Sequence, residues 1–247
     1  MTSSTRRGLG LAAGLLLGWL GSWALLLPTT LGQLPLTLVG GAVVLRTLLQ
    51  TGLFIVAHDA MHSTLWPDRP EVNRRIGQLA LLLYAALPYE RCRRNHVLHH
   101  RHAGTQRDPD HHPDGQPAAW RWYGRFMAAY LSPGQLTGLV LGWLVLAALG
   151  SQVSASPVLN VLLYGALPTL LSSLQLFVVG TYLPHRGAVL HRGAEETPGH
   201  EPRSLAWPCW LSLLSCYHFG YHWEHHAYPH LAWHELPAAR RPAPVRA

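Results

Sequence analysis

The sequence predicts an all-α integral membrane bundle of about four transmembrane helices, with short re-entrant or interfacial helices and a cytoplasmic cap rich in histidine. Three observations lead to this prediction. Apolar residues make up 49% of the 247 residues and charged residues only 13%, about half the share that is typical of soluble domains. Long uncharged segments alternate with arginine-rich connections. Three histidine boxes fall where apolar segments end.

Four apolar segments supply the predicted crossings, and they cover residues 9–27, 36–57, 135–150 and 158–183. A helix of about 20 residues crosses the ~30 Å hydrocarbon core. We expect Pro168 to break the last of them, because proline lacks the N–H that an interior helical position needs. Segments 76–87 and 204–217 are apolar but too short to cross, so we expect re-entrant or interfacial helices there.

The second predicted span contains a charged residue, Arg46, with Gln50 one turn further on. An arginine at this depth faces the bundle interior or reaches for the interface. The span has no acidic residue before Asp59, so the sequence alone names no partner for Arg46. We favour a structural role for it over a chemical one.

The connections between the spans predict the orientation. All 19 basic residues are arginine, and loops 28–35 and 151–157 contain none of them. By the positive-inside rule the arginine-rich side, with both termini, faces the cytoplasm. We therefore expect a multi-pass protein of the inner (cytoplasmic) membrane whose active site faces the cytoplasm. Because there is no internal repeat and no long linker, residues 1–247 are predicted to form a single domain.

The net charge of +7 raises the question of nucleic acid binding. The arginines are scattered among apolar spans and form no basic helix, so nucleic acid is not an expected partner. Three cysteines without a CxxC pair indicate neither a disulfide framework nor a thiolate metal site.

The 17 histidines are the strongest signal in the sequence. Residues 58–62 read HDAMH, residues 96–100 read HVLHH and residues 222–226 read HWEHH. On a helix, positions three and four residues apart share a face, so each box presents two or three imidazoles to one side. The predicted topology places all three boxes on the same side of the membrane.

Clustered imidazoles indicate metal, because as cations they would repel one another and as unpaired neutral groups they would be costly to bury. The boxes supply eight histidines, and His185 at the end of the fourth span makes a ninth. A structural zinc site needs four ligands, so this number suits two metal ions. Ligand type leaves iron, zinc, copper and nickel open.

The boxes resemble those of the membrane fatty-acid desaturase and hydroxylase superfamily, and within it the bacterial β-carotene 4-ketolases. The resemblance rests on TGLFIVAHDAMH at 51–62, HHRHAGT at 99–105 with DPD at 108–110, GTYLPH at 180–185 and CYHFGYHWEHH at 216–226. The chain departs from the family at Ser63, where glycine is usual, at Ala103, where proline is usual, and in the tail from Tyr228 to Pro237.

The resemblance implies oxidation of the C4 methylene of a β-ionone ring to a ketone, in β-carotene or in zeaxanthin, giving echinenone, canthaxanthin or astaxanthin-type products. It implies two Fe²⁺ ions, with O₂ and reduced ferredoxin as co-substrates. Asp59, Asp108 and Glu224 are expected to orient ligand imidazoles, and Asp110 is either a similar carboxylate or a solvated loop acid. The expected metal ligands are His58, His62, His96, His99, His100, His185, His218, His222, His225 and His226, with His218 equally suited to a place behind the ligands.

The sequence leaves other functions open. A fatty-acyl desaturase or a carotenoid ring hydroxylase would use the same boxes. A metal transporter would place its ligands near the bilayer midplane, whereas these lie at span ends. A zinc membrane hydrolase would need a general base, for which Glu224 could serve. A carotenoid would enter from the lipid membrane through an apolar groove, and Trp120, Trp122, Tyr123 and Phe126 either line that groove or form an interface belt.

Overall fold

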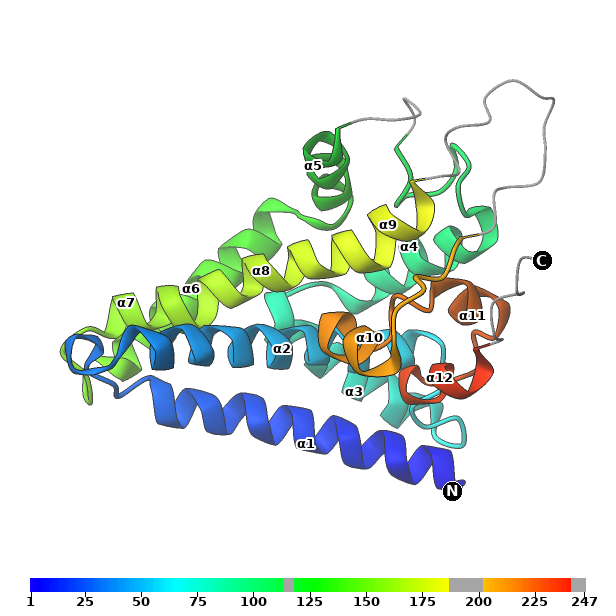
Figure 1. Cartoon of the computed structure of the whole chain (residues 1–247). Helices are drawn as coiled ribbons and strands as arrows, with labels where there is room; N and C mark the ends of the chain where they lie inside the picture. The colour runs from blue at the N-terminus through cyan, green and yellow to red at the C-terminus, as the bar shows by residue number, and fades with distance from the viewer. Residues whose placement is uncertain (113–117, 187–201, 241–247) are drawn as a thin grey trace.

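The computed structural model describes residues 1–112, 118–186 and 202–240, and within these ranges it is helical and contains no β-strand. Figure 1 shows long helices lying side by side and shorter helices gathered at one end of them. The predicted all-α class is confirmed.

The helices follow one another along the chain with short connections. Their bounds are α1 (Ser3–Leu26), α2 (Leu36–Met61), α3 (Pro70–Ala85), α4 (Tyr89–His102), α5 (Ala119–Tyr130), α6 (Pro133–Gly150), α7 (Pro157–Val161), α8 (Leu167–Leu176), α9 (Leu183–His185), α10 (Cys209–Cys216), α11 (His222–Ala227) and α12 (Leu236–Ala239). Single 3₁₀ turns cover Leu31–Gln33 and Trp233–Glu235.

Four helices of the described chain are long and apolar enough to cross a membrane, which confirms the predicted spans. They are α1, α2, α6 and the continuous helix Pro157–His185, which contains α7, α8 and α9. In Figure 1 the α1–α2 and α6–α7 connections lie at one end of the bundle, and α4, α9, α11, α12 and the N-terminus lie at the other. The histidine boxes are therefore at one end of the spans.

Helix α2 is the centre of the bundle and packs against α1, α3 and α8. Its second half, from Gln50 to Met61, is buried almost without interruption. Small residues allow the close approach of α3: a side chain at Gly77 would come within 2.8 Å of Ala60 Cβ. This packing holds the first histidine box, at the end of α2, in a fixed position.

The predicted break at Pro168 is wrong, because the helix continues through it. Residues Leu162–Ala166 form a π-helical turn just before the proline, a common way for a helix to absorb a local misfit. Pro168 has no N–H to give to the carbonyl of Tyr164, four residues earlier. Arg46 supplies a donor instead, with its Nε 2.8 Å from the Tyr164 oxygen.

Arg46 is fully buried, and the structure gives it the partners that the sequence could not name. Its Nη1 donates to the Trp19 carbonyl at 3.0 Å and to the Ser22 hydroxyl at 2.8 Å. Its guanidinium also lies 4.4 Å from the ring centre of Trp23, a cation–π distance. Arg46 thus ties α1, α2 and the fourth span together inside the apolar layer.

We expect Arg46→Met to lower the free energy of unfolding in detergent by on the order of 2–3 kcal/mol, because it leaves buried carbonyls without a donor. Pro168→Ala restores an N–H for the Tyr164 carbonyl. The double variant should therefore lose about 1 kcal/mol less than the sum of the single losses, as contacting sites are not additive. Thermal unfolding of the four proteins measures this, and strict additivity would contradict the assignment.

Candidate metal centre

Four elements bring histidines to the polar end of the bundle. The first box lies at the end of α2, where His58 is in the last helical turn and His62 follows Met61 as the capping residue. The second box is on α4 and the third on α11. His185 is the last residue of α9, at the end of the fourth span.

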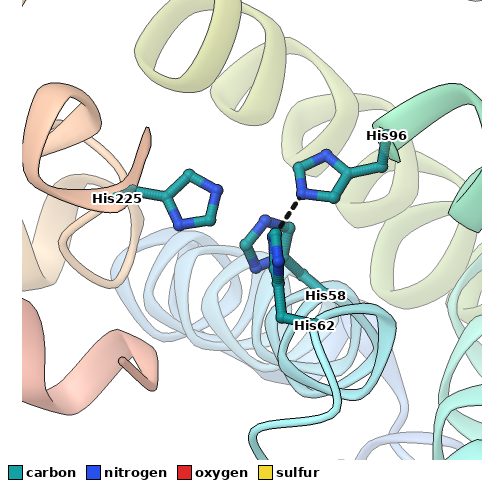
Figure 2. Close-up of side chains that lie close together, drawn as sticks. All are labelled: His58, His62, His96 and His225. Carbon is teal, nitrogen blue, oxygen red and sulfur yellow. Dashed lines mark hydrogen bonds between the residues drawn. The ribbon is translucent and has the colours of Figure 1, made fainter. Parts of the chain in front are cut away.

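The first histidine group consists of His58, His62, His96 and His225, one or two from each box. One ring nitrogen of each lies within 4.8 Å of those of the other three, and His62 Nε2 is 2.6 Å from His96 Nε2. Figure 2 shows the rings of His96 and His225 turned toward His58 and His62 from opposite sides.

The second histidine group consists of His99, His185, His222 and His226, again within 4.8 Å of one another. His185 Nε2 is 2.9 Å from His222 Nε2, and His226 Nε2 is 3.1 Å from His99 Nε2. The second and third boxes thus divide between the groups. His96 and His99 sit three positions apart on α4, while α11 gives His225 to one group and His222 and His226 to the other.

His100 lies between the two groups. Its Nε2 is 2.9 Å from His225 Nε2 of the first group, and its ring stacks on His226 of the second with the ring centres 4.2 Å apart. The structure therefore brings nine of the ten sequence-predicted ligands into one contiguous cluster.

The donor sets fit metal ions. Metal–imidazole bonds of about 2.0–2.1 Å place neighbouring ligand nitrogens about 3 Å apart, close to the separations in both groups. Both ring nitrogens of His58 are buried and have no hydrogen-bond partner among the described residues. Buried polar atoms without partners are rare in folded proteins, and a cation between the four rings would satisfy the one that faces it.

The environment keeps most of these imidazoles in the neutral form that binds metal. Burial, with repulsion from neighbouring histidines, holds the pKa values of His96, His222 and His225 well below the usual range. Burial lowers the pKa of His62 to about 4 and, with the nearby histidines, that of His100 to about 2. At neutral pH these rings carry no charge and offer a lone pair.

His99 differs because a carboxylate holds its second nitrogen. Burial opposes protonation of His99, but the charge and hydrogen bond of Asp108, 2.9 Å from Nδ1, outweigh burial and raise its pKa. Asp108 also accepts the backbone N–H groups of Gly104 and Asp110, each at 2.9 Å. Asp108 thereby fixes the ring so that Nε2 faces the second group, as carboxylates behind metal-binding histidines do.

Asp110 is buried and is not a solvated loop acid. Its Oδ1 accepts a hydrogen bond from the Tyr130 hydroxyl at 2.8 Å, and its Oδ2 lies 3.9 Å from His99 Nδ1. Burial raises the pKa of Asp110 to about 6, although His99 acts in the opposite direction. Sequence reasoning missed Tyr130, because nothing local in the chain relates it to a residue 20 positions away.

Asp59 and Glu224 are both buried, and their closest contacts are with the protein backbone and a serine. Asp59 accepts the Trp233 N–H at 3.3 Å and lies 4.0 Å from His58 Nδ1. Glu224 accepts a hydrogen bond from the Ser204 hydroxyl. These contacts attach the first and third boxes to other parts of the chain.

His218 lies outside both groups. Its ring stacks on Tyr221 with the ring centres 5.4 Å apart and on Trp233 at 6.1 Å. Its backbone has φ 65°, part of the turn that leads from α10 into α11.

Ser63, directly after His62, has φ 60°, a conformation that favours glycine. Glycine is the usual residue at this position in the family that the sequence resembles.

A small chamber opens beside the histidine groups and continues into an apolar groove. The chamber is lined by His58, His96, His99, His222, Cys92, Asp110 and Thr181, among others. The groove has a volume of about 210 Å³ and runs between α5, α6 and α8. Four residues line both spaces and form their junction: Phe54, Phe126, Tyr130 and Leu176.

The four aromatic residues proposed as groove or interface side chains take different places. Phe126 lines the groove and the chamber, and Tyr123 donates or accepts a hydrogen bond with Ser173 at 2.6 Å. Trp122 is buried and donates to the Asp110 carbonyl at 2.7 Å. Trp120 is exposed. Of these residues, Phe126 alone has side-chain surface in both spaces.

Comparison with known proteins identifies relatives along most of the chain. A family model described as "Fatty acid desaturase" matches residues 33–144 and 115–245. The "Beta-carotene ketolase" of Paracoccus sp. (strain PC1) is 40% identical over 97% of this chain and 95% of its own length. That of Paracoccus sp. (strain N81106 / MBIC 01143) is 43% identical over 78% and 76%. The "Zeaxanthin 4-ketolase" of Chlamydomonas reinhardtii is 40% identical over 78% of this chain and 42% of its own.

The two groups predict two metal ions per chain, which elemental analysis of the purified protein measures. His225→Ala and His222→Ala each remove one ligand from one group, so each should lose about one metal. His218→Ala is the matched control from the same stretch of chain and should keep both. A full metal content in the first two variants, or a loss in the control, would contradict the grouping.

Proposed function

This chain belongs to the fatty acid desaturase family, and we propose that it is a carotenoid ketolase of the membrane. It would convert the C4 methylene of a β-ionone ring, in β-carotene or zeaxanthin, to a ketone. The observation that carries the proposal is the junction of an apolar groove with a chamber walled by histidines of both groups. The near-full-length identity to β-carotene ketolases supports the same reaction.

We propose two iron ions as the metals, one in each histidine group. The first would be held by His58, His62, His96 and His225, and the second by His99, His185, His222 and His226, with His100 between them. The donor set is entirely imidazole, which suits iron as well as zinc or copper. Family membership favours iron among these.

The protein's own residues prepare the reaction. Iron, when bound, supplies the reduction of O₂ and the oxidation of the C–H bond. Phe54, Phe126 and Leu176 line the mouth of the chamber, and their apolar side chains would exclude water from a bound ring. Asp108 holds His99 in one orientation. A second oxygenation at the same carbon gives a gem-diol, which loses water to a ketone.

Expression in bacteria that accumulate β-carotene tests the function. We expect mono- and diketo pigments in the extract by chromatography with mass detection. His99→Ala and His225→Ala, one from each group, should abolish the products, since either loss breaks a metal site. Unchanged β-carotene with iron-loaded protein in the membrane would refute this substrate, and an alcohol or an alkene would point to a hydroxylase or a desaturase.

The groove is proposed as the path of the carotenoid from the lipid. Ala166 lines it, so Ala166→Trp fills much of its 210 Å³ and should reduce ketone formation at least tenfold with the metal retained. Ala148→Trp makes the same change at an exposed position of α6 and should leave turnover near that of the parent. Equal effects of the two substitutions on pigment yield would argue against this path.

We propose that the histidine end faces the cytoplasm, in the inner membrane, and receives electrons there from an acidic ferredoxin. Arg93 and Arg94 are exposed on α4, the helix that carries the second histidine box, and would steer such a donor. Replacing both with Ala should slow ferredoxin-driven turnover several-fold at low salt and have less effect at high salt, where charges are screened. Unchanged rates at low salt would remove this role.

We also propose that residues 1–247 act as one domain. Each histidine group takes ligands from α4 in the first half of the chain and from α11 near its end. Neither half could hold a complete group alone.

A further inference from the structure

One hydroxyl in the chamber beside the histidine groups has no hydrogen-bond partner in the part of the chain that the structure describes. Thr181 lines the chamber and is 6% exposed, and its hydroxyl makes no hydrogen bond with any described residue. It lies one helical turn before His185 of the second histidine group.

A hydroxyl without a hydrogen-bond partner is unusual for a threonine in a helix. Such hydroxyls ordinarily return to the carbonyl of the preceding turn, and those of Thr47, Thr51 and Thr169 do so in this protein, at 2.8, 3.0 and 2.9 Å. Thr181 lies within the π-helical segment Phe177–Tyr182, where the wider turn changes the register of side chains against carbonyls. Its hydroxyl is left available to the chamber.

The other polar side chains of the chamber are already engaged. The Tyr130 hydroxyl donates to Asp110 at 2.8 Å. The histidines turn their nitrogens into the two groups. Cys92 offers only a thiol, a weak hydrogen-bonding group. Asp110 also lines the chamber, with Oδ1 hydrogen-bonded to Tyr130 and Oδ2 3.9 Å from His99 Nδ1. Of the chamber's two hydroxyls, on Tyr130 and Thr181, that of Thr181 is therefore the one still open to a polar atom on a bound ring.

The reaction itself creates such an atom. In the first oxidation, R₂CH₂ + O₂ + 2e⁻ + 2H⁺ gives R₂CHOH + H₂O, with O₂ and an external electron donor as co-reactants. In the second, R₂CHOH + O₂ + 2e⁻ + 2H⁺ gives R₂C(OH)₂ + H₂O, and the diol loses water to form R₂C=O. An alcohol released after the first step would end the sequence before the ketone.

We propose that the Thr181 hydroxyl hydrogen-bonds the C4 alcohol and retains it in the chamber until the second oxidation. The groove by which the alcohol would leave is almost wholly apolar, so a hydroxyl that enters it unpaired loses hydrogen bonding. The hydrogen bond to Thr181 would make the chamber more favourable for the alcohol than the groove. This role rests on the ketolase function proposed above.

Thr181→Val tests the role, because valine has nearly the same shape and no hydroxyl, while Thr181→Ser keeps the hydroxyl and is the matched control. In cells that contain β-carotene, we expect the ratio of 4-hydroxy to 4-keto rings to rise at least tenfold for Thr181→Val. Thr181→Ser should keep the parent ratio, and all proteins should keep their metal. Thr181→Ala serves in the same way if the valine variant is not recovered from the membrane.

A binding measurement distinguishes retention of the alcohol by Thr181 from a general change in the packing of the chamber. Without O₂ and reductant, quenching of tryptophan fluorescence gives the affinity of the purified protein for 4-hydroxy-β-carotene and for β-carotene. Loss of one hydrogen bond should weaken the alcohol about fivefold and leave β-carotene unchanged. Equal weakening of both, or an unchanged alcohol-to-ketone ratio in Thr181→Val, would overturn the proposal.

Two further results would also overturn it and can be told apart. If Thr181→Val affects only rings that carry a hydroxyl at C3, the residue serves substrate choice and not retention of the C4 alcohol. If the parent protein holds its metal and forms no ketone, the ketolase function fails and the retention role fails with it.

Discussion

The convergence of buried imidazoles is the constraint on which the rest of the structure depends. Eight rings in two groups turn nitrogens toward one another, and burial keeps most of them neutral. Neutral rings do not repel as cations, but their lone pairs still need partners that water does not supply inside the protein. A metal ion in each group would meet this need. The rings meet because α2, α4, α11 and the end of the fourth span bring them to the same end of the bundle.

The scaffold that holds these rings is stabilised inside the apolar layer by polar contacts as well as by packing. Arg46 shows how: its donors reach backbone carbonyls on two other helices, one of them that of Tyr164, four residues before Pro168. Polar groups in lipid must be satisfied within the protein, so the proline and the arginine compensate for each other. The fourth span thereby remains continuous and delivers His185 to the second group.

The same helix joins the site to the groove. Its two π-helical segments change the register of the side chains that follow them. The first precedes Pro168, and the second, which begins directly after Leu176 at the junction with the groove, contains Thr181 at the chamber. Asp110 and Tyr130 form a second connection between the groove wall and the histidine groups, through His99. The groove, the chamber and the histidine groups are therefore parts of one packed unit.

The sequence by itself determined the helical class, the four spans and the boxes, because hydrophobic runs and histidine spacings are local properties of the chain. It also indicated two metals from the number of histidines. Only the tertiary structure decided how the boxes divide between two groups, that His218 stands apart, and that Asp110 is buried against Tyr130. It also decided the partners of Arg46 and the continuity of the helix at Pro168. These depend on contacts between residues far apart in the chain, and helical periodicity carries no information about which distant side chain completes a contact.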